Sequence, residues 1–165
     1  MKIAHLVAQH ITELFEGGNW TEVNIKDTLA DISWKEAVSV TKASYNTIAA
    51  LVHHLTFYNQ VVLSRVKGNN PVIGETNGFD VPAIKNEHEW DSLKNSCMQS
   101  AKDLTDTVDK LTNEEVFGLT ATGHSTNYKT LHGISEHGHY HLGQIILLKK
   151  LLRHKTHHTS RSNSL

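Results

Sequence analysis

Apolar residues along most of this chain recur at spacings of three and four positions, the period of one helical face. The pattern predicts four long helices, over residues 2–16, 43–66, 86–111 and 125–153. Gly17 and Gly18 are placed to end the first helix and Gly68 the second. Either Ser125 or Thr126 could cap the fourth. The pattern therefore favours an all-α protein, and four helices of this length are typical of a four-helix bundle.

The segments between these helices have a different composition. Residues 67–84 are rich in Gly and Asn and hold both prolines, Pro71 and Pro82, which predicts a long loop. Residues 19–35 form an irregular segment, with a short helical turn expected near 34–38. There is no internal repeat and no convincing alternating strand.

Composition fits one domain and excludes several classes of protein. The chain has 165 residues, which we assign to a bundle over residues 1–153 and a disordered tail over residues 154–165. Sixteen basic residues balance seventeen acidic ones, so the chain lacks the basic field that nucleic-acid binding needs. No apolar run is long enough to span a membrane, so neither partner is expected.

Cysteine usage suggests the compartment. Cys97 is the single cysteine, which rules out an intrachain disulfide and favours a reducing cytoplasm. The N-terminal residues also lack the continuous apolar run of a signal peptide. Cys97 lies in the apolar stripe of the third predicted helix, so we expect a buried, inert thiol.

Histidine is the unusual residue, with thirteen in the chain. His137 and His141 lie one turn apart on the fourth predicted helix, where both rings project to nearly the same side and could share a metal ion. Two half-buried histidines with separate hydrogen bonds are the alternative. The segment HGHYH lacks the Glu of an HExxH metalloprotease, and the chain has one ExxH where a ferritin-like di-iron site needs two.

A third ligand could come from the second predicted helix, which carries adjacent histidines. His54 lies about 60° from the apolar stripe at Leu51, whereas His53 lies about 200° from it. We therefore prefer His54 and keep His53 as the alternative. The remaining histidines of the helical part are more typical of surfaces and helix ends: His5, His10, His88, His124, His132 and His139.

Three segments resemble motifs of the DinB-like superfamily. The segment IAALVHHLTFYNQVVLSRVKG resembles its first metal motif, and HGISEHGHYHLGQIILLKKLL resembles its second, His-x-x-x-His followed by Gly-Gln. The segment NWTEVNIKDTLADISWKEA resembles its linker between helices. The resemblance spans about residues 1–153 and places the family's metal ligands on His54, His137 and His141. It also implies an orienting role for Gln144, while Leu142 stands where many members carry Arg.

The resemblance further implies a four-helix bundle in down-up-up-down order, a metal near one end, and often a homodimer. Relatives include metal-dependent thiol transferases and thiol-dependent isomerases that use low-molecular-weight bacterial thiols. Three neutral imidazoles would leave a divalent ion charged, with an open position for a thiol or water. Zinc and nickel are our first choices, with iron and manganese also compatible with imidazole. Tyr58, Tyr140 or Gln144 could position the substrate.

Two other functions remain open at this point. The metal could only stabilise the fold, in a non-catalytic bundle that acts as a binding or stress-response protein. A metal-free bundle could instead serve protein association. The first function that we predict is a metal-dependent enzyme, a thiol S-transferase or a related hydrolase-type activity.

Overall fold

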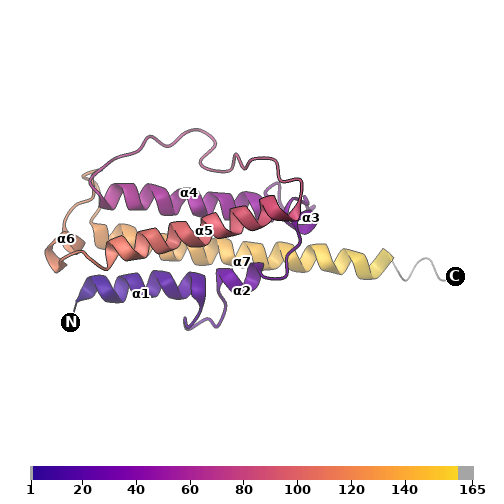
Figure 1. Cartoon of the computed structure of the whole chain (residues 1–165), viewed down its shortest axis with the longest axis horizontal. Coiled ribbons are helices and arrows are strands. Elements are labelled where there is room, and N and C mark those ends of the chain that lie inside the picture. The colour runs from indigo at the N-terminus through magenta and orange to yellow at the C-terminus, as the bar shows by residue number, and fades with distance from the viewer. Residues whose placement is uncertain (1, 160–165) are drawn as a thin grey trace.

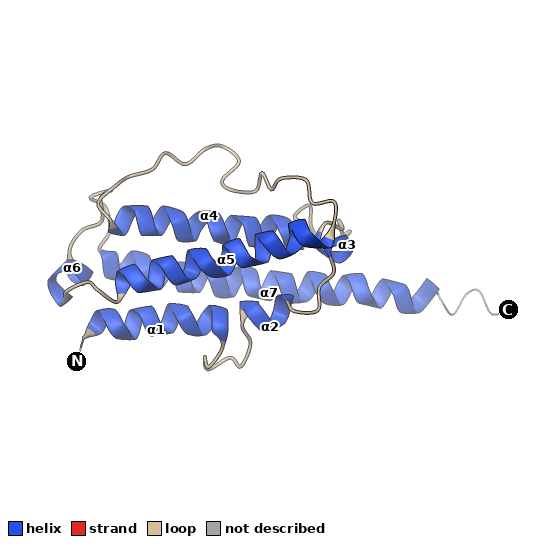
Figure 2. Cartoon of the chain, in the orientation of Figure 1, coloured by secondary structure: helices blue, strands red, loops and turns tan. Residues whose placement is uncertain are grey.

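The structure, a computed structural model, describes residues 2–159, and their side chains up to residue 154. This part of the chain is helical and contains no strand, as Figure 2 shows. The helices are α1 (Ile3–Glu16), α2 (Ile25–Leu29), α3 (Trp34–Ala37), α4 (Ile48–Val66), α5 (Glu87–Val108), α6 (Asn113–Phe117) and α7 (Asn127–Thr159). The predicted all-α class is confirmed.

The four longest helices pack against one another. Helix α5 contacts both α1 and α4, and α7 also contacts both α1 and α4, so α1 and α4 lie diagonally across the group. Residues 67–86 run back along the length of the molecule, and α4 and α5 therefore both begin at the end where α3 lies (Figure 1). This long connection allows neighbouring helices to run in the same direction.

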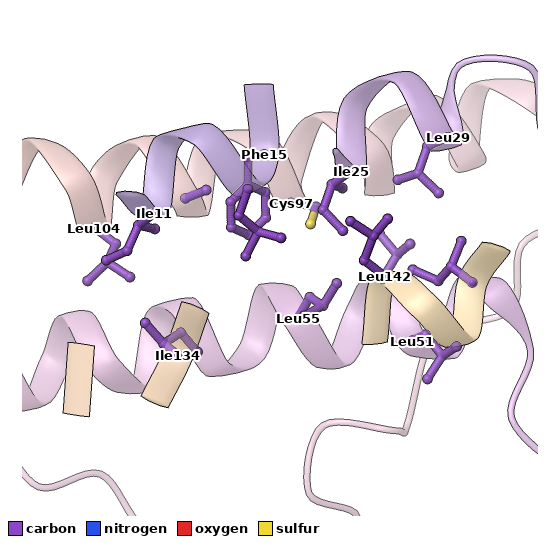
Figure 3. Close-up of a cluster of buried hydrophobic side chains, with 14 of the residues drawn as sticks. Ile11, Phe15, Ile25, Leu29, Leu51, Leu55, Cys97, Leu104, Ile134 and Leu142 are labelled. Atoms are coloured by element: carbon purple, nitrogen blue, oxygen red, sulfur yellow. The ribbon is translucent and has the colours of Figure 1, made fainter. Parts of the chain in front are cut away.

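Apolar side chains from all four helices meet in one core. In Figure 3, Ile11 of α1 lies beside Leu104 of α5, and Phe15 of α1 lies between them and the group of Leu55, Cys97 and Leu142, which come from the other three helices. Short helix α2 covers one end of this core with two further buried side chains, Ile25 and Leu29. The core thus holds α4 against α7, the two helices that carry the candidate ligands.

Helix boundaries differ from the prediction where local hydrogen bonds decide them. Helix α4 begins at Ile48, not near residue 43, because Thr47 accepts the backbone N–H of Ala50 as an N-cap. The residues before it form a turn closed by a bridge between Thr41 and Ser44. For α7, Thr126 accepts the N–H of Lys129 at 3.1 Å, so it serves as the cap rather than Ser125.

Two five-residue helices, α2 and α6, were not predicted. Both are too short to show a helical period in the sequence. Asn24 caps α2 and Thr112 caps α6, the latter in a capping box with Glu115. Helix α5 also ends at Val108, three residues earlier than expected.

Helix α7 is longer than the prediction and is anchored near its end. It continues to Thr159, beyond the predicted boundary at residue 153, while residues 160–165 of the expected tail lie outside the described part. Arg153 donates to Glu36 and Asp31, each at 2.8 Å. Hydrogen bonds from Lys149 and from Arg153 lower the pKa of Asp31 to about 2. Within residues 2–159, no helix combines the length and apolar character that crossing a membrane requires.

Candidate metal centre

Three histidine rings from two helices meet between α4 and α7. The Nε2 atom of His137 lies 3.0 Å from Nε2 of His54 and 3.0 Å from Nε2 of His141. Their candidate ligand atoms all lie within 4.8 Å of one another, and the rings of His54 and His141 are buried. Two nitrogens that share an ion at about 2.0–2.1 Å can be at most roughly 4.2 Å apart, so both 3.0 Å separations allow a common ion.

A loop segment fixes the ring of His54. Its Nδ1 lies 2.7 Å from the carbonyl oxygen of Asn77, which can only accept, so Nδ1 carries the hydrogen and donates. The ring of Phe79 stacks on the imidazole with centroids 4.0 Å apart, and Tyr58 contacts it edge-on at 4.8 Å. Nε2 is consequently left unprotonated, with its lone pair toward the other histidines.

A side chain one turn further along α7 fixes the ring of His141. Nδ1 of His141 donates to Oε1 of Gln144 at 2.7 Å, and Nε2 of Gln144 donates to the hydroxyl of Tyr140 at 3.0 Å. This is the orienting role that the resemblance implies for Gln144. It leaves Nε2 of His141 unprotonated as well, the state that a metal ligand requires.

The resulting hydrogen-bond arrangement is incomplete without a cation. The Nε2 atoms of His54 and His141 both carry lone pairs, and both face Nε2 of His137. That nitrogen has at most one hydrogen to donate. At least one of the two short contacts therefore sets two lone pairs against each other, a repulsion that a shared cation would remove. The donor set thus fits a divalent metal.

Burial keeps these rings neutral. Desolvation by burial, and to a smaller extent the neighbouring His141 and His54, lower the pKa of His137 to about 4. Burial also lowers the pKa of His54 and of His141, although their hydrogen bonds to Asn77 and Gln144 oppose the shift. Neutral imidazole is the form that binds metals, so the site would retain its ligands in the required state below neutral pH.

His137 differs from the other two candidates because its second nitrogen is unsupported. Its buried Nδ1 has no hydrogen-bond partner among the described residues. The next residue, Gly138, lies against Leu14 of α1, where an added Cβ would come within 2.3 Å of Leu14 Cδ2. Glycine therefore leaves room for α1 beside the histidine pair.

The loop from Asn77 to Phe79 is a part of the site that the sequence analysis missed. Besides the carbonyl that binds His54, the side chain of Asn77 accepts the hydroxyl of Tyr58 at 2.5 Å. Asn77 and Gly78 both have positive φ, and a Cβ at Gly78 would lie 2.6 Å from Phe57. The Asn-Gly dipeptide signals such a turn, but nothing in it signals contact with a histidine.

The other sequence candidates lie elsewhere. His53 bonds through Nδ1 to the carbonyl of Gly78 at 2.8 Å and lines a different cavity, so His54 rather than His53 joins the pair. Cys97 is fully buried, and burial raises the pKa of its thiol to about 12, as expected for an inert cysteine. Among the described residues, no second group of His, Cys, Asp or Glu has a metal-binding arrangement.

Comparison with known protein families gives a match. The model of the DinB superfamily matches residues 18–145. This range includes His54, His137, His141 and Gln144, and it leaves out α1 and the end of α7. No curated protein and no solved structure matches the chain significantly.

Proposed function

The chain belongs to the DinB superfamily, and from that premise we propose a metal-dependent enzyme that transfers a small thiol to an electrophilic substrate. His54, His137 and His141 would hold one divalent ion. The observation that carries the proposal is the convergence of three Nε2 atoms, two of them fixed as lone-pair donors by Asn77 and Gln144. A divalent ion there would supply a Lewis acid that lowers the pKa of a bound thiol or water.

The residues around the histidines would position the reactants. A cavity of about 280 Å³ opens beside His54 and His137, and Tyr58 and Asn77 also line it. Its volume suits a small molecule. Phe79 stacks on His54 and shields that ring from water. In the reaction, the sulfur of the thiol forms a bond to an electrophilic carbon, and the bond from that carbon to the leaving group breaks. The leaving group departs with the electron pair of that bond, and the thiol proton passes to it through water.

Several finer assignments belong to the same proposal. We assign the chain the four-helix bundle in down-up-up-down order, supported by the long connection that lets α4 and α5 start at the same end. Zinc or nickel is the preferred ion, ahead of iron or manganese. We propose a low-molecular-weight thiol as the partner. We also propose that the protein forms a homodimer and is located in the cytoplasm. The balanced charge favours neither nucleic acid nor membrane as a partner.

Metal analysis of the full, untagged chain tests the site. His154, His157 and His158 would first be replaced by Gln, because clustered histidines bind stray metal themselves. We expect about one ion per chain, lost in His54→Ala, His137→Ala and His141→Ala. Metal retained in all three variants would contradict the proposal.

Thiol chemistry is tested separately with the metal-loaded protein. A panel of small thiols and electrophilic acceptors should yield a product that depends on the metal and on His54. A purely structural metal would instead give no turnover across the panel and a large loss of stability in His54→Ala. This second candidate function would then replace the first.

A further inference from the structure

The cavity beside the histidines extends along the seam between α4 and α7. On α4, His54, Tyr58, Val62 and Arg65 follow one another at steps of four, four and three, which places them on one face. From α7 and the loop the lining comprises Thr130, Gly133, Ile134, His137 and Asn77. The histidines and Arg65 thus line different parts of the cavity, separated along α4.

Arg65 is the charged residue among those that line this cavity, and no carboxylate in the lining pairs with its guanidinium. No Asp or Glu lines the cavity. The Nε atom of Arg65 is buried and lacks a hydrogen-bond partner among the described residues. A guanidinium is always charged and presents several donors in a plane, so leaving it unpaired in a half-buried position is unfavourable. The missing partner is an acceptor with negative charge.

Space for such a partner is available on α7. Gly133 faces the cavity, and a Cβ added there would meet no atom within 4 Å. Thr130 and Tyr58 add hydroxyl groups to the lining. The cavity therefore combines one cation, several hydrogen-bonding groups and an open wall, which suits an oxyanion carried by a small molecule.

Resting on the proposed function, we propose that Arg65 binds a carboxylate of the thiol that the site activates. Arg–carboxylate pairs form two parallel hydrogen bonds, which fix orientation as well as contributing affinity. The sulfur would then lie at the histidines and the carboxylate at Arg65. Arg65 is accordingly a specificity-determining residue that selects anionic over neutral thiols.

The helix geometry sets the length of this thiol. Arg65 follows His54 by three turns of α4, which corresponds to about 16 Å along the axis. Both side chains tilt toward the N-terminus of the helix, but arginine is the longer one, so its guanidinium can reach back further than the imidazole and shorten the gap to roughly 12–14 Å. A thiol with its carboxylate next to the sulfur is too short, and 6-mercaptohexanoate has a suitable span.

Calorimetric titration of the zinc-loaded full chain tests the proposal with three matched probes. These are 6-mercaptohexanoate, the neutral 6-mercaptohexanol, and hexanoate, which lacks the thiol. We expect the mercapto acid to bind about 10- to 100-fold more tightly than the mercapto alcohol. Arg65→Gln should remove that preference without weakening the alcohol, and Arg65→Lys should keep part of it.

A steric variant provides an independent readout. Gly133→Leu should fill the open wall and weaken the mercapto acid at least about 10-fold, since its side chain would occupy the space of the ligand. Gly143→Leu is the matched control, because Gly143 lies on the same helix, is exposed, and also has no atom within 4 Å of an added Cβ. It should leave all three titrations unchanged.

The outcomes separate this inference from the proposed function. If the acid and the alcohol bind equally, or if Arg65→Gln binds the acid as tightly as the wild type, the role of Arg65 is refuted while thiol binding stands. If neither thiol binds, the thiol chemistry is refuted, and the titration with hexanoate then tests whether Arg65 forms an anion site. Hexanoate binding that Arg65→Gln weakens then supports the anion site, and hexanoate binding unaffected by the substitution, or absent, overturns it.

Discussion

Two groups of three histidines each take two of their members from α7. One of these groups has the arrangement of a metal site, and the other does not. In the buried group, His54 joins His137 and His141, with Nε2 atoms 3.0 Å apart in two pairs. The second group, on the α1 side, consists of His10, His132 and His139. The ring centroid of His10 lies 5.8 Å from that of His132 and 6.2 Å from that of His139.

The difference lies in what holds each ring. His54 and His141 each donate Nδ1–H to an oxygen on the far side of the ring, which turns Nε2 inward. In the second group His139 donates to the carbonyl of Ser135 in its own helix, and the side chain of His132 is half exposed. A histidine-rich surface therefore does not by itself form a metal site. Burial, together with the outer hydrogen bonds that turn Nε2 of His54 and His141 toward His137, distinguishes the first group from the second.

Alanine substitutions should give the largest contrast between the groups. His54→Ala, His137→Ala or His141→Ala should each weaken zinc binding by more than about 100-fold, because ligand removal exceeds the roughly 10- to 100-fold loss typical of orienting groups. His10→Ala, His132→Ala and His139→Ala should leave affinity unchanged. Competition titration with a chelating dye measures the zinc affinity of both sets of variants. An equal loss of affinity in the two sets would show that the two groups of histidines do not differ in metal binding.

Sequence spacing was sufficient for the pair on one helix but not for its surroundings. His137 and His141 share a face because α7 is regular, and helical phase favoured His54 over His53 because α4 is regular too. The structure brings those three residues together. Periodicity could not reveal the carbonyl of Asn77, because the direction of a loop carbonyl depends on the tertiary path of the loop.

The same limit applies to the fold. Apolar periodicity located the four long helices, since each buries a continuous stripe. It misplaced the start of α4 and missed α6, where the caps Thr47 and Thr112 decide the boundaries. Arg65 also escaped notice, because a cation near a helix end is ordinary in sequence. Its significance arises only from the cavity and the missing partner.

Removing an outer hydrogen bond should make the buried group more like the exposed one. In Gln144→Leu, the ring of His141 loses the acceptor that fixes its orientation, and zinc affinity should fall about 10- to 100-fold. Gln9→Leu is the control, since Gln9 lies on α1 and its side chain donates to Glu13 at 2.7 Å. The same dye competition measures both variants, and equal affinities would show that Gln144 does not orient the site.

Gly138 allows stability to be changed separately from metal binding. In Gly138→Ala, the new Cβ conflicts with buried Leu14 and should push α1 from α7. We expect a free energy of unfolding lower by about 1–2 kcal/mol, the cost of overpacking reduced by the better helix propensity of Ala. Zinc affinity should stay unchanged because α4 and α7 supply the ligands.

Gly143→Ala on the same helix is the control for that experiment. It meets no neighbour and should raise the free energy of unfolding by up to about 1 kcal/mol. Urea denaturation measures both variants. If Gly138→Ala also raised stability, the contact with Leu14 would not limit the packing of α1 on α7.

The pH dependence of the metal-free protein provides a further contrast between the two groups. An unfolded histidine has a pKa near 6.5, whereas burial lowers the pKa of His137 to about 4. Between these pH values the unfolded chain binds more protons than the folded chain. The contribution of His137 to the free energy of unfolding is therefore full above pH 6.5 and decreases as the pH falls toward 4. The melting temperature of the metal-free chain should fall by roughly a few degrees from pH 7 to pH 5. His137→Gln should reduce this fall and His10→Gln should not. Equal pH profiles for these two variants would mean that burial does not distinguish the two groups of histidines.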